Sequence, residues 1–546
     1  MAETHQDKKT GEVVGPSGPN VETLHAVESF EVGTLEESSG DAIDDAMLRA
    51  QGYKAAMPRV FSILSSIGLC FSITNSWVGA LSNFGQGLRY GGPQVVIFSL
   101  IVATFVQWII TLGLSELASA FPCSAGQYHF VYILAAPKYK RISAFVTGWM
   151  SVLAWWIMTC SGLSLCAISA TGLAAFMYPS YEPTSWQIWL VYVGMAIFSV
   201  IPLFIFPKFL TKLATGSLYL TIIGFAVWFI VLLAMKKESN PGSLMTESGL
   251  GSSGWSSGTA WMLGISNAMY CYGGTDAAIH IAGEMHSPGR QIPQAMNLTM
   301  LIGFVTCVPI MVVFMFVMKD MDKIMNAGFP AAELLYEATG NRPVTIFLTV
   351  WLILIYISCL PPQFVECGRI GWAFARDNGL PFSNYFAHID EKLAFPVRTT
   401  LASVVFTAIY GLLYLASSTA FNSIITSAVL FLNITLALPQ AILVIRGRNT
   451  HLPRRYVNLG WVGYFCNIFS PLWIIVLTAL VCMPPSIPVE VGTMNYTSPI
   501  LVGLFAIVIG SWFIYGHQFE GPKIDWEMLN ATHELAGEGT SKKDKQ

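Results

Sequence analysis

The sequence predicts an all-α membrane protein with twelve transmembrane helices. Hydrophobic residues make up 54% of the 546 residues and charged residues only 11%, whereas an ordinary soluble domain carries about 25% charged residues. Apolar runs of about 20 residues recur along the chain, and a helix needs roughly that many residues to cross about 30 Å of hydrocarbon. A membrane β-barrel would instead show short segments of alternating hydrophobicity.

The predicted helices and two polar tails account for the whole chain. The helices cover residues 60–83, 93–120, 142–176, 186–206, 214–235, 260–283, 294–318, 344–374, 397–416, 420–445, 461–483 and 498–516. With their loops they form one membrane domain at residues 57–518. Residues 1–56 are polar, acidic and contain Gly and Ser, which predicts a disordered tail, and residues 519–546 form a second tail.

Basic residues in the loops predict how the chain is oriented. Loops after even-numbered spans carry about twice as many Lys and Arg residues as loops after odd-numbered spans, and cytosolic loops are the ones enriched in these residues. Both tails should therefore lie in the cytosol. The N-terminus lacks the apolar segment of a signal peptide, so we expect the first span to direct insertion.

Composition excludes several classes of site. Lys and Arg residues are scattered over the loops, with no basic block interleaved with aromatic residues, so nucleic acid is not an expected partner. The 10 cysteines lie mostly inside apolar runs, and their spacing indicates neither a disulfide framework nor a zinc site. We therefore expect no metal and no cofactor.

The sixth span contains helix-breaking and ionisable residues. The stretch YGGTDAAIHIAGEMH (272–286) places Gly273 and Gly274 at membrane depth, followed by Thr275 and Asp276, which are both good helix N-caps. Irregular backbone at this depth is tolerated only where it is buried in protein or lines a cavity. We expect the sixth span to lose regular helix from Tyr272 to Thr275.

The first span carries a matching group of small polar residues in SILSSIGLCFSITNSWVG (62–79). Broken helices at corresponding positions of two halves of a chain point to a transporter substrate site near the bilayer midplane. We expect the first span to be irregular from Gly68 to Ser72, although small residues there are also typical of close helix contacts. The expected substrate-binding residues are Gly68, Ser72, Thr74, Tyr272, Gly273, Gly274 and Asp276.

Asp276, His280 and Glu284 follow one another at intervals of four, which places them on one face of a helix after the break. Ionisable residues at membrane depth are costly and usually functional, so the three are candidates for proton coupling. Asp276 facing the cavity would also attract a substrate ammonium group. Each residue has an alternative role: Asp276 as a helix cap, His280 as a hydrogen-bond partner of another helix, and Glu284 as a loop tether.

Charged and aromatic residues of other spans also have open roles. Glu366 and Arg369, three positions apart in the eighth span, most simply neutralise each other, and Glu116 is a gate or a structural acid rather than a ligand. Six aromatic residues fall on spans that would surround the cavity, where they either form a cage for a quaternary ammonium group or pack in the core and against lipid. They are Trp77, Trp155, Trp156, Tyr270, Tyr272 and Tyr356.

Five stretches of sequence carry a family resemblance. They are GLCFSITNSW (68–77), LSELASAFPCSAGQY (114–128), HIAGEMHSPGRQIPQAM (280–296), WAFARDNGLP (372–381) and LYLASSTAF (413–421). With these motifs the chain resembles the fungal amino acid/choline transporter family of the amino acid–polyamine–organocation superfamily. It departs from the family at Cys70 and Ser72, because the family tends to have glycines in this part of the first span.

The resemblance implies a leucine-transporter-like fold, in which two five-helix repeats of opposite orientation contain the broken helices 1 and 6. The repeats would span about 60–235 and 260–445, and residues 461–516 would form two accessory helices. The resemblance also implies secondary active transport, and therefore a transporter rather than an enzyme.

The sequence thus predicts a permease that imports an amino acid or a small amine, such as choline or 4-aminobutyrate, across the plasma membrane, driven by protons. Its expected partners are this small-molecule substrate and the lipid bilayer. A polyamine or organellar amine carrier is the alternative within transport. A nutrient sensor that binds substrate without moving it is the alternative outside transport.

Overall fold

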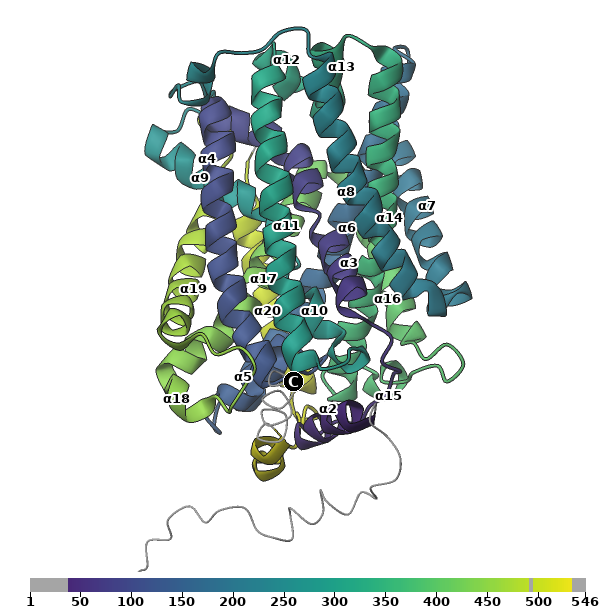
Figure 1. Cartoon of the computed structure of the whole chain (residues 1–546), viewed down its shortest axis with the longest axis vertical. Coiled ribbons are helices and arrows are strands. Elements are labelled where there is room, and N and C mark those ends of the chain that lie inside the picture. Colours follow the sequence, from purple (N-terminus) through teal and green to yellow (C-terminus); the bar gives the residue numbers. More distant parts are fainter. Residues whose placement is uncertain (1–37, 491–493, 533–546) are drawn as a thin grey trace, which may run out of the picture.

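The computed structural model describes residues 38–490 and 494–532. Within these ranges the regular elements are helices, and long helices stand side by side along the vertical axis of Figure 1. The long helices are α4 (Ser76–Ala120), α6 (Lys140–Met177), α7 (Ser185–Ile205), α8 (Leu210–Met235), α11 (Pro288–Val317), α14 (Arg342–Arg376), α16 (Val397–Ala416), α17 (Ser418–Arg446), α19 (Gly460–Val481) and α20 (Thr497–Tyr515). The short helices α3 (Ile63–Thr74), α9 (Ser257–Met269) and α10 (Ala277–His280) lie among them.

Ten helical segments of the described residues are long and apolar enough to cross a membrane, whereas the sequence predicts twelve. One of the ten, Ile63–Ala120, is 58 residues long and contains the first two predicted spans. These are joined because α3 leads directly into α4, which continues through the non-helical residues Gly91 and Gly92. The sixth predicted span is divided between α9 and α10, and each piece is too short to count as a crossing.

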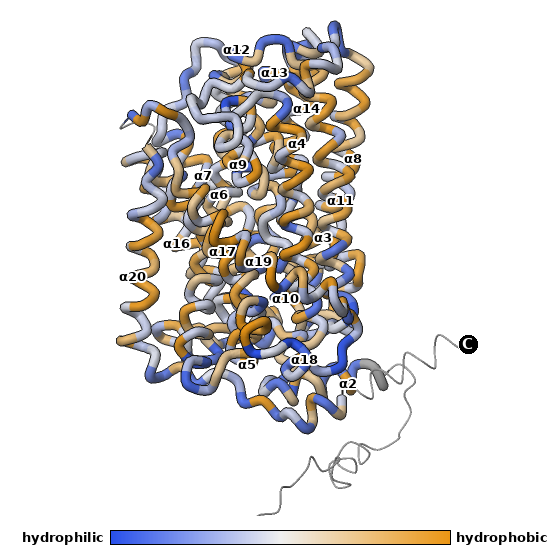
Figure 2. Tube along the Cα trace, turned by 90° about the vertical axis from the view of Figure 1, so that its left-hand side faces the viewer, coloured by the Kyte–Doolittle hydropathy of each residue, from blue (hydrophilic) through white to orange (hydrophobic). Residues whose placement is uncertain are grey.

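The outer helices expose large apolar side chains. Ile230 of α8 is 62% exposed, Ile409 of α16 is 61% exposed and Phe513 of α20 is 79% exposed. Figure 2 shows apolar residues along the lengths of the long helices and polar residues concentrated toward the two ends of the bundle. Contiguous apolar surface of this kind is suited to lipid rather than to water.

The broken helices occupy the interior of the bundle. α3 packs against α8, α11 and α14, while α9 packs against α4 and α10 packs against α3. A capping box starts α3: the Ser65 N–H donates to the Ser62 hydroxyl at 3.3 Å, and the Ser62 N–H donates to the Ser65 hydroxyl at 2.9 Å. These contacts bring the first helix of each predicted repeat to the centre of the molecule.

The end of the N-terminal tail is folded against the bundle. The prediction of disorder is wrong for residues 38–56, where helix α2 (Ser38–Ala50) lies beneath the bundle in Figure 1. The tail composition is polar on average, but Met47 of α2 is only 4% exposed because it packs into the main hydrophobic core. This tertiary burial offsets the ordering cost that predicts disorder.

Part of the predicted C-terminal tail also packs onto the bundle. Phe519 and Leu529 are fully buried, and the Asp525 N–H donates to the carbonyl oxygen of Ala50 in α2 at 2.8 Å. The two described ends of the chain therefore meet on one side of the bundle, which we call the tail side. The rest of the two predicted tails, residues 1–37 and 533–546, lies outside the described residues.

Candidate functional site

The first helix break lies at Asn75, between α3 and α4. Asn75 adopts the left-handed conformation, with φ of 36° and ψ of 55°, which asparagine tolerates better than most residues. The prediction of a break from Gly68 to Ser72 is wrong, because α3 is regular through these residues. Gly68 instead allows α3 to approach α8, since a Cβ at this position would lie 2.7 Å from the carbonyl oxygen of Ala214.

The second break lies where the sequence predicts it. α9 ends at Met269 and leads through the short turn η3 (Tyr270–Tyr272) to Gly274, whose φ of 81° is a conformation that favours glycine. A Cβ on Gly274 would lie 3.0 Å from the Ile73 side chain and 3.3 Å from the Trp155 ring. Because Ile73 is in α3, the two breaks are direct neighbours.

An inner cavity of about 60 Å³ lies between the two breaks. Thr74 and Asn75 line it from the first break, Tyr270 and Gly273 from the second, and Tyr356 from α14. Neither the nitrogen nor the oxygen of the Asn75 amide has a partner within the described ranges. The volume corresponds to about two water molecules, so a larger ligand requires the walls to move apart.

A larger vestibule of about 730 Å³ adjoins the inner cavity. The two spaces share Leu165, Tyr270 and Val429. The vestibule also includes Arg89, whose guanidinium donates to the backbone of α12 (Met321–Asn326). α12 and α2 lie at opposite ends of the bundle in Figure 1, so the vestibule opens on the side away from the tails.

A buried ion pair lies on the tail side of the second break. Arg369 of α14 donates through Nε and Nη2 to the carboxylate of Glu284, with 2.6 Å between Nη2 and Oε2. The Phe61 N–H donates to the Glu284 carbonyl oxygen at 3.0 Å. The expectation that Glu366 neutralises Arg369 is wrong. Glu284 accepts two hydrogen bonds from the Arg369 guanidinium, and a two-point contact of this kind is stronger than a single one.

Asp276 is fully buried behind the second break. Its Oδ2 accepts hydrogen bonds from Gln127 Nε2 at 2.5 Å and from Trp155 Nε1 at 3.3 Å, and it lies 3.4 Å from His280 Nε2. Its Oδ1 has no partner in the part of the chain that the structure describes. No side-chain hydrogen bond from Asp276 caps α10, so capping does not account for this carboxylate.

His280 connects Asp276 to the segment before α5 (Gln127–Leu134). Its Nδ1 lies 3.2 Å from the carbonyl oxygen of Ser124, and since a carbonyl can only accept, this nitrogen carries a proton. Gly126 makes room for the ring, because a Cβ there would lie 2.8 Å from His280 Cε1. Asp276 and His280 therefore form an enclosed acid–base pair on α10, while Glu284 follows in the separate turn η4 (Ala282–Glu284).

Of the predicted substrate-binding residues, Thr74 and Gly273 line the inner cavity. Gly68, Ser72, Tyr272, Gly274 and Asp276 are buried but do not line it. The Tyr272 hydroxyl, for example, accepts a hydrogen bond from Thr104 at 2.6 Å. Gly274 places Asp276 toward α5 and α6 instead of the cavity.

Two amide side chains line the cavity without having been predicted from the sequence, Asn75 and Gln363. A lone amide inside an apolar span was the available signal, because such a group is costly in lipid. Among the six candidate aromatic residues, Tyr270 and Tyr356 line the inner cavity. The indole of Trp156, in contrast, donates to the Cys367 carbonyl oxygen at 3.1 Å.

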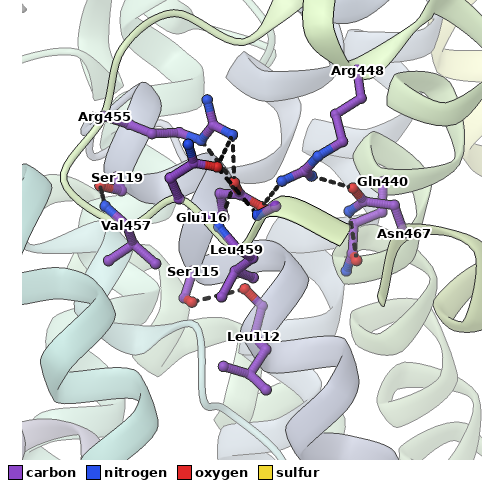
Figure 3. Close-up of polar contacts among 12 residues, drawn as sticks. Leu112, Ser115, Glu116, Ser119, Gln440, Arg448, Arg455, Val457, Leu459 and Asn467 are labelled. Carbon is purple, nitrogen blue, oxygen red and sulfur yellow. Dashed lines mark hydrogen bonds and ion pairs between the residues drawn. The ribbon is translucent and has the colours of Figure 1, made fainter. Parts of the chain in front are cut away.

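Glu116 belongs to a separate network at the end of α4, shown in Figure 3. Its carboxylate receives hydrogen bonds from Arg455 Nε at 2.8 Å, from the Leu459 N–H at 3.1 Å and from Arg448 Nη2. Arg448 also donates to Asn467 Oδ1 at 2.6 Å. These contacts connect α4 to the loop before α19. They favour the role of Glu116 as a structural acid over its role as a gate.

The cysteine and acidic side chains form no metal site in the described ranges. No group of three or more His, Cys, Asp or Glu residues there has the arrangement of a metal site. All ten cysteines are free, and nine of them are buried.

The sequence matches the model of a family described as amino acid permease over residues 62–506. The chain belongs to the amino acid permease family. This permease is 30% identical over 477 residues to the choline transporter of Saccharomyces cerevisiae, covering 86% of this chain and 84% of the relative. It is 28% identical to the swainsonine transporter of Arthroderma benhamiae, and the match covers 83% of this chain and 90% of that relative. It is 25% identical to the 7-keto 8-aminopelargonic acid transporter of Saccharomyces cerevisiae, and the match covers 82% of this chain and 91% of that relative.

A solved structure supports the fold of this permease. A single-residue mutant of the manganese transporter of Eremococcus coleocola superimposes with a TM-score of 0.52, covering 91% of this chain and 99% of that one, at 11% identity. A likeness at this identity shows the fold alone. The prediction of an all-α membrane transporter, and of the superfamily, is confirmed, and the family and its relatives are transporters rather than enzymes.

Proposed function

We propose that this permease imports an amino acid or a small amine, such as choline or 4-aminobutyrate, across the plasma membrane by proton-coupled secondary transport. The inner cavity carries this proposal, because it lies between two helix breaks and combines tyrosine rings with amide groups. The yeast relative named as a choline transporter makes choline the first substrate to test.

The cavity lining fits a substrate with one cationic group. The rings of Tyr270 and Tyr356 offer π-faces to an ammonium group. The unpartnered Asn75 amide, with the backbone N–H groups at the start of α4, offers donors to a carboxylate or hydroxyl. Among the described residues, no charged side chain lines the cavity, which gives a polyamine with several cationic groups less support as the substrate.

Asp276, His280 and Glu284 remain the proposed coupling residues from the sequence. Asp276 and His280 form the buried acid–base pair, and Glu284 is held by Arg369 on the tail side. In this proposal Thr74 and Gly273 contact the substrate, while Gly68, Ser72, Tyr272 and Gly274 shape the walls of the cavity. A proton bound near Asp276 and His280 would compensate the charge of these two residues during transport.

The proposed orientation places the tail side in the cytosol, so the vestibule would open outside the cell. Epitope tags at both ends of the chain test it. Antibodies should reach either tag only after the cells are permeabilised, and labelling of a tag in intact cells would reverse the orientation.

Competition of uptake tests the substrate class. Cells without their own choline and 4-aminobutyrate uptake would express the permease, and labelled choline, 4-aminobutyrate and amino acids would each be measured against a panel of unlabelled competitors. Saturable uptake of one of these substrates supports the proposal. Uptake of polyamines alone, or location in an organelle membrane, would favour the alternative carrier.

A further inference from the structure

Glu366 is a buried acid without a partner. It lies on α14, it is 0% exposed, and neither oxygen of its carboxyl group has a hydrogen-bond partner among the residues that the structure describes. An ionised carboxylate in such a place would be costly, whereas the neutral acid avoids this cost. The surroundings therefore favour the protonated form of Glu366 in this conformation.

Ionisable groups of several elements lie within electrostatic range of Glu366. They are Asp276 and His280 at the second break and α10, Glu284 in η4, Cys70 in α3, and Arg369 and Cys367 on α14 itself. Arg369 is the one permanent cation among these groups, and its Nε and Nη2 are already bonded to Glu284. The group thus offers no free cation to hold an ionised Glu366.

Arg369 nevertheless has an unused donor. Its Nη1 has no partner in the described part of the chain, although the side chain is 1% exposed. Residues three positions apart on a helix are neighbours, so the Arg369 guanidinium lies within electrostatic range of both Glu284 and Glu366. An ionised Glu366 would compete with Glu284 for it.

We propose that Glu366 adds to the coupling residues named above as the group that carries the proton, and that its ionisation loosens the Glu284–Arg369 pair. The proposal rests on the proton-coupled function proposed above. Neutral Glu366 leaves Arg369 bonded to Glu284, and the tail side stays closed. When the Glu366 carboxyl O–H bond breaks, the proton leaves to the tail-side solution and the carboxylate accepts the N–H of Arg369 Nη1. Proton release and opening of the tail side are therefore linked.

The variant Glu366→Gln tests the proposal, because glutamine has the size of the neutral acid and cannot release a proton. The full chain would be reconstituted in liposomes with whichever substrate the wild type accumulates. We expect substrate binding to remain, while the pH dependence of uptake and the substrate-evoked entry of protons are lost. A Gln variant with the wild-type pH profile and proton entry would overturn the proposal.

Three further variants keep the test decisive. Glu238→Gln is the matched control, because it makes the same change at an exposed partner of Lys319 and should retain proton entry. Asp276→Asn tests the rival carrier: if it loses proton entry while Glu366→Gln keeps it, Asp276 carries the proton instead. Glu366→Asp keeps a titratable carboxyl group and should keep proton-driven uptake with a shifted pH midpoint. The Asp variant decides the case in which the Gln variant is misfolded or too slow to measure, and an unchanged midpoint would count against Glu366.

Failure of this proposal differs from failure of the proposed function. If the wild type itself shows no proton-driven uptake of any substrate on the panel, the proposed function is wrong. If the wild type is proton-driven and Glu366→Gln is indistinguishable from it, only the assignment of Glu366 is wrong.

Discussion

Arg369 Nη2 lies 2.6 Å from Glu284 Oε2, and this contact joins α14 to the turn that follows the second helix break. Arg369 is 1% exposed and Glu284 is 4% exposed. The guanidinium also lies over the rings of Phe61 and Phe395, at 5.9 and 5.6 Å from their centroids. One ion pair therefore gathers four segments of the chain on the tail side of the substrate cavity.

Glu284→Gln should destabilise the closed tail side. Removing one partner of a buried ion pair leaves the other charge uncompensated and costs about 3–5 kcal/mol. We expect a clearly lower melting temperature for the purified variant. The control is Glu238→Gln, which removes an exposed partner of Lys319 and should cost at most about 1 kcal/mol. Equal melting temperatures for the two variants would show that the buried pair does not stabilise this conformation.

Tyr356→Ala should weaken binding of a quaternary ammonium substrate. A cation over an aromatic ring gains about 0.5–2 kcal/mol, which corresponds to a loss of about two- to thirtyfold in apparent affinity for choline. Tyr356→Phe keeps the ring and should stay near the wild-type affinity. The measurement is the concentration dependence of choline uptake at matched surface expression. Equal losses in both variants would point to the hydroxyl group rather than to the ring.

Asp276→Asn separates two roles for this carboxylate. Because Asp276 is fully buried and does not line the cavity, we expect apparent substrate affinity within about threefold of the wild type. Direct pairing with a substrate ammonium group would instead cost about 1.5–3 kcal/mol, or about ten- to a hundredfold in affinity. Uptake kinetics decide between the two, with Thr74→Val as a control at a residue that does line the cavity.

Asp44 should make the docking of α2 depend on pH. Burial raises the pKa of Asp44 from 3.8 to about 6, against the opposing effect of the hydrogen bond from the Ser287 N–H. A raised pKa means that docking favours the protonated acid. Docking should therefore be strongest below pH 3.8, weaken as the pH rises to about 6, and change little above that.

Spin labels on Arg49 and Lys392 would measure this docking as a distance distribution between α2 and the bundle. The distribution should broaden as the pH rises through the window set by Asp44. Asp44→Asn should remove the change. A distribution that is constant with pH in the wild type would contradict the assignment.

Local sequence signals predicted the second break and not the first. Two adjacent glycines followed by Thr and Asp are a backbone signal that depends on no other part of the chain, and the chain turns at Gly274 as expected. Considered without its neighbours in space, Gly68 also suggests a helix break. Its role depends on α8, whose backbone lies too close for any other residue, and the break falls at Asn75 instead.

Tertiary partners account for the other differences. Spacing along a helix pairs Arg369 with Glu366, but Glu284, 85 residues away in sequence, offers two oxygens to the guanidinium. Composition similarly predicts disorder for residues 38–56, because it carries no information about the C-terminal segment and loops on which α2 packs. Both errors arise because contacts between distant segments outweigh local preferences.

Proton-driven accumulation in liposomes is the sharpest test of the proposed transport function. Purified permease would be reconstituted, and labelled choline, 4-aminobutyrate and amino acids would be offered with acid outside and without sodium. We expect at least one of these substrates to accumulate above its equilibrium level, and we expect accumulation to collapse when a protonophore dissipates the gradient. No accumulation of any of them under the gradient, or accumulation that requires sodium, would contradict the proposed function.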